Sequence, residues 1–172
     1  MINIRAARQD ETLLLRDVGL RAWAFAVSGM DVNPAMQVAA EAAFESFAVN
    51  HWLTISVVED DGVMAGWAAR EKLDETITDF WIDPDHQRRG LGTALLAAVE
   101  ADILHQGFDT AELQTHARNA AIAFFERGGY TIRWLSVAYS PKLDRDVETV
   151  GLSKRLDGGD DDGVYGMTSR LQ

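Results

Sequence analysis

The chain has 172 residues, a formal net charge of −11 and no cysteine, with 47% apolar and 25% charged residues. This composition is typical of one globular domain with its own core, and the missing cysteine excludes disulfides, thiolate metal ligands and a cysteine nucleophile. The negative charge argues against nucleic acid or an anionic membrane as a partner, because phosphate binding requires a basic surface.

Neither a membrane segment nor a metal site is indicated. No apolar run approaches the about 20 residues that a membrane helix needs, and the first 20 residues show no signal-peptide pattern. We therefore expect no membrane association and a cytoplasmic location. The histidines at 51, 86 and 105 lack the spacing of metal ligands, so we expect no metal.

The N-terminal third reads as a strand followed by two helices. Residues 2–6 alternate as in a strand, residues 10–27 are expected to be helical, and a second helix is expected from Asn33-Pro34 to near Asn50. Asparagine is a favoured N-cap, and proline suits the first helical position. The first helix is expected to direct four residues to the core, namely Leu13, Leu14, Val18 and Leu20.

A hairpin and a further strand follow. Asp61-Gly62 joins two β-rich runs, 52–58 and 63–69, and Asp-Gly is a strong hairpin signal. Residues 76–83 are predicted to form one strand that ends at a proline. Ile77, Asp79 and Trp81 are expected on one face of that strand, and Phe80 and Ile82 on the other.

The remaining elements alternate between helix and strand. A helix is predicted from about Gln87 to Gly107, with an apolar stripe at Leu91, Leu95, Val99 and Ile103. A strand at 110–117, a short helix at 120–127 and strands at 131–139 and 148–156 come next. Residues 157–172 are rich in glycine and aspartate, and we expect a flexible tail there.

The element order is therefore β-α-α-β-β-β-α-β-α-β-β. It predicts an α/β domain over residues 1–156 with a mixed central sheet. Strands 76–83 and 110–117 should form a parallel pair joined by a right-handed crossover.

The start of the crossover helix carries the clearest chemical signal. The pattern places Arg88 and Arg89 in its first turn, where each cation is unfavourable by about 0.3–1 kcal/mol. A bound phosphate would explain them, because free backbone N–H groups, the helix dipole and two guanidinium groups would converge on it. Gly90 and Gly92 would allow its close approach. A solvated polar turn fits these residue types equally well, and the pattern is neither a Walker loop nor a dinucleotide fingerprint.

Two segments resemble the motifs of one enzyme family. Residues 80–92, Phe-Trp-Ile-Asp-Pro-Asp-His-Gln-Arg-Arg-Gly-Leu-Gly, resemble the acetyl-CoA signature of the GNAT superfamily of N-acetyltransferases. Residues 119–130, Asn-Ala-Ala-Ile-Ala-Phe-Phe-Glu-Arg-Gly-Gly-Tyr, resemble the second motif of that family. The resemblance covers residues 2–156. It implies the GNAT acyl-CoA fold, in which the two parallel strands splay apart and pantetheine lies between them.

The resemblance implies acetyl-CoA as co-substrate. Pantetheine would pair with backbone groups near Phe80 and Ile82, and the pyrophosphate would bind the backbone amides of residues 87–93. The implied cofactor-binding residues are Phe80, Ile82, Gln87, Arg88, Arg89, Gly90, Leu91, Gly92, Thr93, Asn119 and Phe125.

The two usual catalytic positions of the family lack a titrating group. Phe125 stands where a tyrosine commonly protonates the leaving thiolate, and Gln114 stands where protein-N-terminus acetyltransferases carry a glutamate base. Asp79 and His116 are therefore the candidate catalytic residues, although each also fits an ordinary strand position.

The expected activity is direct transfer of an acetyl group from acetyl-CoA to an unidentified primary amine in a ternary complex. The alternative is a GNAT-fold module that binds acyl-CoA as a sensor or structural element with little or no turnover. The sequence also leaves open whether the protein forms a homodimer.

Overall fold

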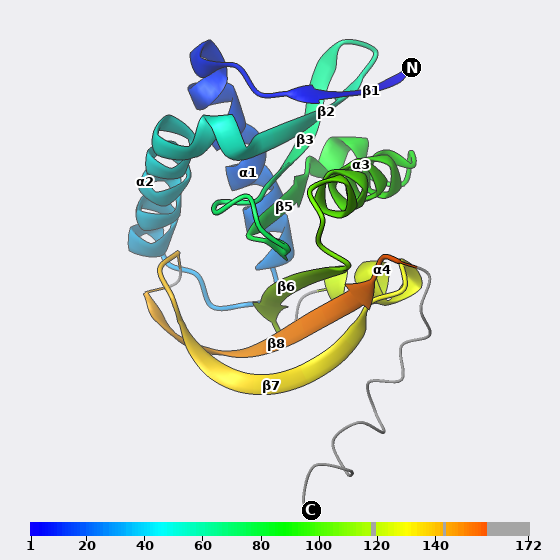
Figure 1. Cartoon of the computed structure of the whole chain (residues 1–172). Helices are drawn as coiled ribbons and strands as arrows, with labels where there is room; N and C mark the ends of the chain where they lie inside the picture. Colours follow the sequence, from blue (N-terminus) through cyan, green and yellow to red (C-terminus); the bar gives the residue numbers. More distant parts are fainter. Residues whose placement is uncertain (118–119, 143, 158–172) are drawn as a thin grey trace, which may run out of the picture.

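The computed structural model describes residues 1–117, 120–142 and 144–157 (Figure 1). Asn119 and nearly all of the predicted tail lie outside these residues. The main elements are β1 (Ile2–Ala6), α1 (Thr12–Ala26), α2 (Pro34–His51), β2 (Ile55–Asp60), β3 (Val63–Ala69), β4 (Thr76–Ile77), β5 (Asp79–Ile82), α3 (Leu91–His105), β6 (Thr110–His116), α4 (Ala121–Arg127), β7 (Thr131–Ser140) and β8 (Arg145–Arg155). The α/β class is confirmed, and the element order agrees except that the strand predicted over residues 76–83 forms two strands, β4 and β5. β8 begins three residues earlier than predicted.

The strands form two four-stranded sheets. One has the order β1-β2-β3-β5 and the other β4-β6-β8-β7. The predicted parallel pair is confirmed between β4 and β6, but it spans only the pairs Thr76 with Glu112 and Ile77 with Leu113. Beyond that point β5 pairs with β3, and the structure shows no pairing of β5 with β6 among the described strands. The mixed sheet is therefore divided where the two parallel strands splay apart.

The division falls at Thr78, within the single strand predicted for residues 76–83. The amide of Thr78 donates to the carbonyl of Ala69 at 2.8 Å, which turns the chain from one sheet to the other. The prediction that Ile77 shares a face with Trp81 is wrong. Ile77 lies in the same core as Phe80 and Ile82, because the interruption at Thr78 breaks the two-residue alternation of the strand.

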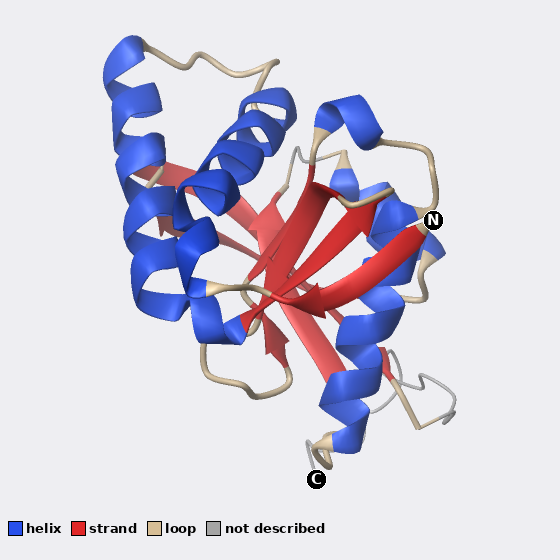
Figure 2. Cartoon of the chain, turned by 90° about the horizontal axis from the view of Figure 1, so that it is seen from above, coloured by secondary structure: helices blue, strands red, loops and turns tan. Residues whose placement is uncertain are grey.

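Helices cover both faces of the first sheet (Figures 1 and 2). α1 and α2 pack on one face, where Trp67 donates its indole N–H to the carbonyl of Leu15 at 2.9 Å. α3 packs on the other face through the predicted stripe of Leu91, Leu95, Val99 and Ile103, all at most 3% exposed. This second core continues onto β6, β8 and α4, so α3 joins the two sheets.

The start of α2 agrees with its sequence signal, whereas the predicted core face of α1 is partly wrong. Asn33 caps α2 by accepting a hydrogen bond from the amide of Met36 at 2.9 Å, as predicted. Leu13 and Leu14, however, are 54% and 45% exposed and not part of the core. Burial in α1 follows a helical stripe that begins at Leu15 and continues through Val18, which leaves the two preceding leucines outside it.

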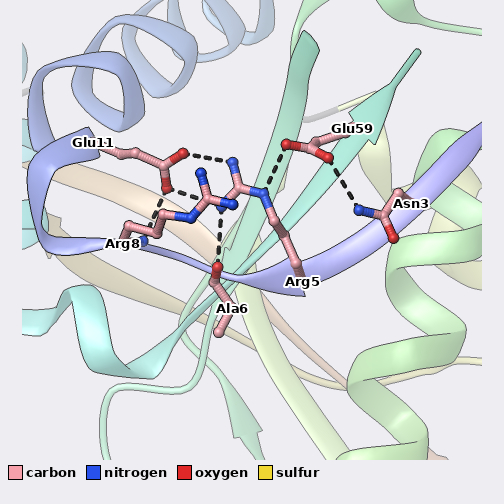
Figure 3. A network of polar contacts seen from close by, with 6 residues as sticks. All are labelled: Asn3, Arg5, Ala6, Arg8, Glu11 and Glu59. Carbon is pink, nitrogen blue, oxygen red and sulfur yellow. Dashed lines mark hydrogen bonds and ion pairs between the residues drawn. The ribbon is translucent and has the colours of Figure 1, made fainter. Parts of the chain in front are cut away.

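A polar network joins β1, β2 and the turn before α1 (Figure 3). The guanidinium of Arg5 donates to both carboxylate oxygens of Glu11, at 2.5 and 3.0 Å, and to Glu59 at 2.7 Å. Glu59 also accepts from Asn3, and Glu11 from the amide of Arg8. Hydrogen bonding to Arg5 lowers the pKa of Glu11, so the network is strongest when both carboxylates are ionised.

Candidate functional site

The residues predicted to form the first turn of the crossover helix form part of a loop between β5 and α3. α3 begins at Leu91 and not at Gln87, because Arg88 and Gly90 have φ angles of 63° and 78° that interrupt helical geometry. Arg88 and Arg89 therefore do not lie in the first turn of the helix, and that prediction is wrong. They lie in the exposed loop just ahead of it.

The N-terminus of α3 has the geometry of an anion site. The first amides of the helix, from Leu91, Gly92 and Thr93, have no acceptor within the helix, and the cap residue Gly90 has no side chain to supply one. The side chain of Leu91 is buried in the core, so it can contribute only its backbone N–H. These amides and the positive end of the helix dipole favour a negatively charged group.

The two glycines at the start of α3 are required for different structural reasons. A Cβ on Gly90 would meet nothing within 4 Å, so its positive φ explains the glycine. A Cβ on Gly92 would lie 3.2 Å from Cζ of Phe124, so the absence of a side chain permits close packing of α4 against α3. Gly90 is therefore required by its backbone conformation, and Gly92 by the packing of Phe124.

Asp83 anchors the loop, and sequence reasoning missed this. Its side chain is 5% exposed, and one carboxylate oxygen accepts from Nε and Nη2 of Arg21 at 3.0 and 2.6 Å. The other oxygen accepts from the amide of Asp85 at 3.1 Å and caps the 3-10 turn Pro84–His86. Burial raises the pKa of this carboxyl, but the bonds from Arg21 and Asp85 outweigh burial and hold the pKa below its usual value. An aspartate before a proline is a capping signal that the sequence did contain.

Arg89 is already engaged by a carboxylate. Its Nη1 lies 3.0 Å from Oδ2 of Asp60, at the end of β2, and Nδ1 of His86 lies 3.6 Å from the same oxygen. The hydrogen bond from Arg89 lowers the pKa of Asp60. An anion bound at the helix would therefore compete with Asp60 for Arg89, whereas Arg88 has no such partner among the ion pairs of the described residues.

β5 presents backbone groups to the region where the strands splay. The amide of Asp83 donates to Ala65 in β3 at 2.8 Å. Because successive residues of a strand direct their backbone groups to opposite edges, Phe80 and Ile82 direct theirs away from β3. These are the two residues predicted to pair with pantetheine, and their outer edge has no strand partner in the described part of the chain.

Four aromatic rings pack behind this edge. The ring of Phe125 lies 5.4 Å from Phe80, 5.1 Å from Phe124 and 5.6 Å from Tyr130, each in an edge-to-face contact. Phe125 is 3% exposed and Tyr130 2% exposed. Burial raises the pKa of Tyr130, whose hydroxyl donates to Glu100 at 3.3 Å. Tyr130 therefore has a packing role, and Phe125 packs against the splayed strand through the ring of Phe80.

Asp79 and His116 lie on the two strands that border the splay. Asp79 is the first residue of β5 and accepts from the indole N–H of Trp81 at 3.1 Å. Burial raises its pKa, against the opposing effect of Lys142, Trp81 and Thr78. His116 ends β6, and burial lowers its pKa, which favours the neutral imidazole. The raised pKa makes the Asp79 carboxylate a stronger base, and the lowered pKa leaves the His116 imidazole in the form that can accept a proton.

Gln114 lies on the side of the second sheet that faces away from its core. It borders a cavity of about 170 Å³ whose wall includes Glu112, Trp134 and Gly151. The indole of Trp134 covers Gly151 so closely that a Cβ there would lie 2.1 Å from Cε2. Residues of β7 around it are exposed and apolar, including Leu135 and Val137.

Comparisons with known proteins agree with this geometry. A sequence profile of the Acetyltransferase (GNAT) family matches residues 21–130. The ribosomal protein bS18-alanine N-acetyltransferase of Escherichia coli strain K12 is 35% identical over 107 residues, which cover 60% of this chain and 72% of that protein. The mycothiol acetyltransferase of Clavibacter michiganensis subsp. michiganensis is 35% identical over 82 residues, covering 46% of this chain and 27% of that protein.

Solved structures share the fold. The PaiA N-acetyltransferase of Thermoplasma acidophilum, in complex with coenzyme A, superposes with a TM-score of 0.75 at 14% identity and covers 90% of this chain and 99% of its own. The Escherichia coli ribosomal-protein-S18-alanine N-acetyltransferase gives a TM-score of 0.68 at 24% identity and covers 94% and 98%.

The family profile and the relatives define the class of this protein as an acetyltransferase. The chain belongs to the GNAT family of N-acetyltransferases. None of the helices within the described residues is long and apolar enough to cross a membrane. Within the same residues, no three histidine, aspartate or glutamate side chains are grouped as a metal site.

Proposed function

We propose that this protein transfers the acetyl group of acetyl-CoA directly to a primary amine in a ternary complex. The observation that carries the proposal is the outer edge of β5, which has no strand partner among the described residues and leads into the helix N-terminus at Gly90. An extended pantetheine would pair with Phe80 and Ile82 as an added strand. The pyrophosphate would then meet the free amides of residues 91–93.

The chemistry requires one proton acceptor and no covalent intermediate. The amine nitrogen attacks the thioester carbonyl, Asp79 or His116 takes the amine proton, the C–S bond breaks, and water protonates the thiolate. Placing both substrates in one site supplies most of the rate enhancement. The sequence contains neither a cysteine nor a G-x-S-x-G motif for an acyl-enzyme.

The cofactor site is tested by Gly90→Val. At 100 times its dissociation constant, acetyl-CoA should stabilise the native protein by about 2.7 kcal/mol, and acetate should not. The variant should lose this gain. Gly107→Val is the matched control, because Gly107 also has a positive φ, of 96°, and open space around it, but lies at the far end of α3. If acetyl-CoA stabilises Gly90→Val as much as it stabilises the native protein, the cofactor does not bind at this loop.

Direct transfer is tested by kinetics over a panel of amines, including a peptide that begins with alanine, since the curated relative acts on an alanine of a ribosomal protein. Intersecting double-reciprocal lines are expected. Parallel lines, or a gain in protein mass after acetyl-CoA alone, would contradict a ternary complex.

The second candidate function is acyl-CoA binding with little turnover, and Phe125 favours it because it has no hydroxyl for the leaving thiolate. A positioned general acid contributes about 10²–10⁴-fold. If the Phe125 ring reaches the thioester, Phe125→Tyr should raise kcat and leave the affinity for acetyl-CoA unchanged. A lower melting temperature with unchanged kcat would make the ring purely structural. Binding without thiol release in either protein would favour the binding function.

A further inference from the structure

The hairpin between β7 and β8 brings a cation onto the first half of the domain. Nζ of Lys142 lies 4.9 Å from the ring centroid of Phe44 in α2 and 5.7 Å from that of Trp81 in β5. Those two rings meet edge-to-face at 5.2 Å, and Phe44 is 1% exposed. An ammonium within about 6 Å of two aromatic rings is attracted to both.

A carboxylate completes this arrangement. Asp79 accepts the indole N–H of Trp81 at 3.1 Å, which fixes it beside the ring that Lys142 contacts. Burial raises the pKa of Asp79, and of the charged groups nearby Lys142 opposes this shift while Glu71 adds to it. Two rings from α2 and β5 thus contact an ammonium supplied by a distant segment, and a carboxylate of β5 attracts it at longer range.

The position of Lys142 is unusual for a lysine on a hairpin. A lysine near a surface usually extends its ammonium into water. Here the side chain is half-buried, and within the described residues it has no carboxylate partner at 4.0 Å or less. The aromatic contacts and the longer-range attraction to Asp79 therefore account for its direction.

We propose that Phe44, Trp81 and Asp79 form the subsite for an alkylammonium group of the acceptor, and that Lys142 occupies it until the acceptor displaces it. The inference rests on the proposed function, since Asp79 is also a candidate base and borders the splayed strands. The occupant indicates the ligand class, an unbranched primary alkylammonium with the shape of a lysine side chain. The charge of −11 favours the approach of such cations.

The experiment measures n-butylammonium binding by calorimetry without acetyl-CoA, at constant ionic strength. Lys142→Ala should bind it more tightly than the native protein, by about 2- to 30-fold, because the competing cation is gone. Lys142→Met retains the aliphatic part of the side chain, so it tests whether the gain comes from a disturbed hairpin. It should show the same gain in affinity as Lys142→Ala. Lys72→Ala removes the same charge from an exposed loop and should change nothing.

The subsite itself is tested by adding Asp79→Asn to Lys142→Ala, which should abolish the gain. Unchanged affinity in both Lys142 variants, or an equal gain in Lys72→Ala, would overturn the proposal.

A turnover measurement separates this inference from the function on which it rests. Thiol release with n-butylamine should show a lower KM for the amine in Lys142→Ala and an unchanged KM for acetyl-CoA. If no protein releases thiol with any amine while the binding gain persists, the transferase proposal fails and the subsite stands. If thiol is released but the affinity for n-butylammonium is the same in the native protein and the Lys142 variants, the subsite proposal is wrong and the transferase proposal stands.

Discussion

Replacing Arg21 by methionine should destabilise the protein through the loop that precedes α3. The substitution removes both hydrogen bonds to Asp83 and leaves a carboxylate that is 5% exposed with only the amide of Asp85 as donor. Hydrogen bonds to a charged group contribute about 1.5–3 kcal/mol, and breaking a fully buried pair costs about 3–5 kcal/mol. Arg21 is 49% exposed, so water partly replaces it, and we expect a loss of about 2 kcal/mol.

The loss corresponds to a melting temperature lower by about 4–8 °C for a domain of this size. Differential scanning calorimetry at pH 7 measures it. Because the pKa of Asp83 is depressed in the folded protein, its contribution is present above the ordinary aspartate pKa of about 3.9 and is lost as the pH falls. The difference between native protein and variant should therefore shrink below about pH 4.

Two variants serve as controls. Arg16→Met makes the same change on the same helix, but Arg16 pairs with carboxylates that are 46–50% exposed, so its effect should be much smaller. Adding Asp83→Asn to Arg21→Met should restore part of the stability, because no unpaired charge remains buried. If Arg21→Met costs no more than Arg16→Met, or if its cost does not change between pH 7 and pH 3, the reasoning is refuted.

Three further outcomes follow from contacts elsewhere. Gly151→Ala should cost about 1–3 kcal/mol in urea denaturation, because its Cβ would lie 2.1 Å from Trp134, and Trp134→Ala in the same chain should relieve that cost. His116 has a lowered folded pKa, so stability should fall as the pH drops below about 6.5, and His116→Gln should flatten that part of the profile. Arg5→Met should destabilise more at pH 7 than at pH 3, since Glu11 has a depressed folded pKa and its pairing is lost in acid; equal losses at both values would contradict this.

The sequence predicted the elements that depend on local signals. Asn33-Pro34 supplied a cap and a first helical residue, and α2 begins there. The stripe from Leu91 to Ile103 repeats at the helical period, and all four residues are buried. The two motifs predicted the family, because each depends on a short run of residues with a fixed order of types. The predicted helix start at Gln87 was wrong, because Arg88 and Gly90 have left-handed backbone conformations that prevent a helix there.

Long-range contacts decided the rest, because no local pattern reports them. The break at Thr78 arises from competition between β3 and β6 for one strand, so alternation alone predicted a continuous strand and put Ile77 on the wrong face. Asp83 and Arg21 are 62 positions apart and meet only after α1 packs against the first sheet. Lys142 reaches Phe44 only because the β7–β8 hairpin folds across to α2. The sequence by itself determined the family and the position of the loop for which we propose anion binding; the tertiary structure determined which charged groups hold that loop and which rings contact the lysine.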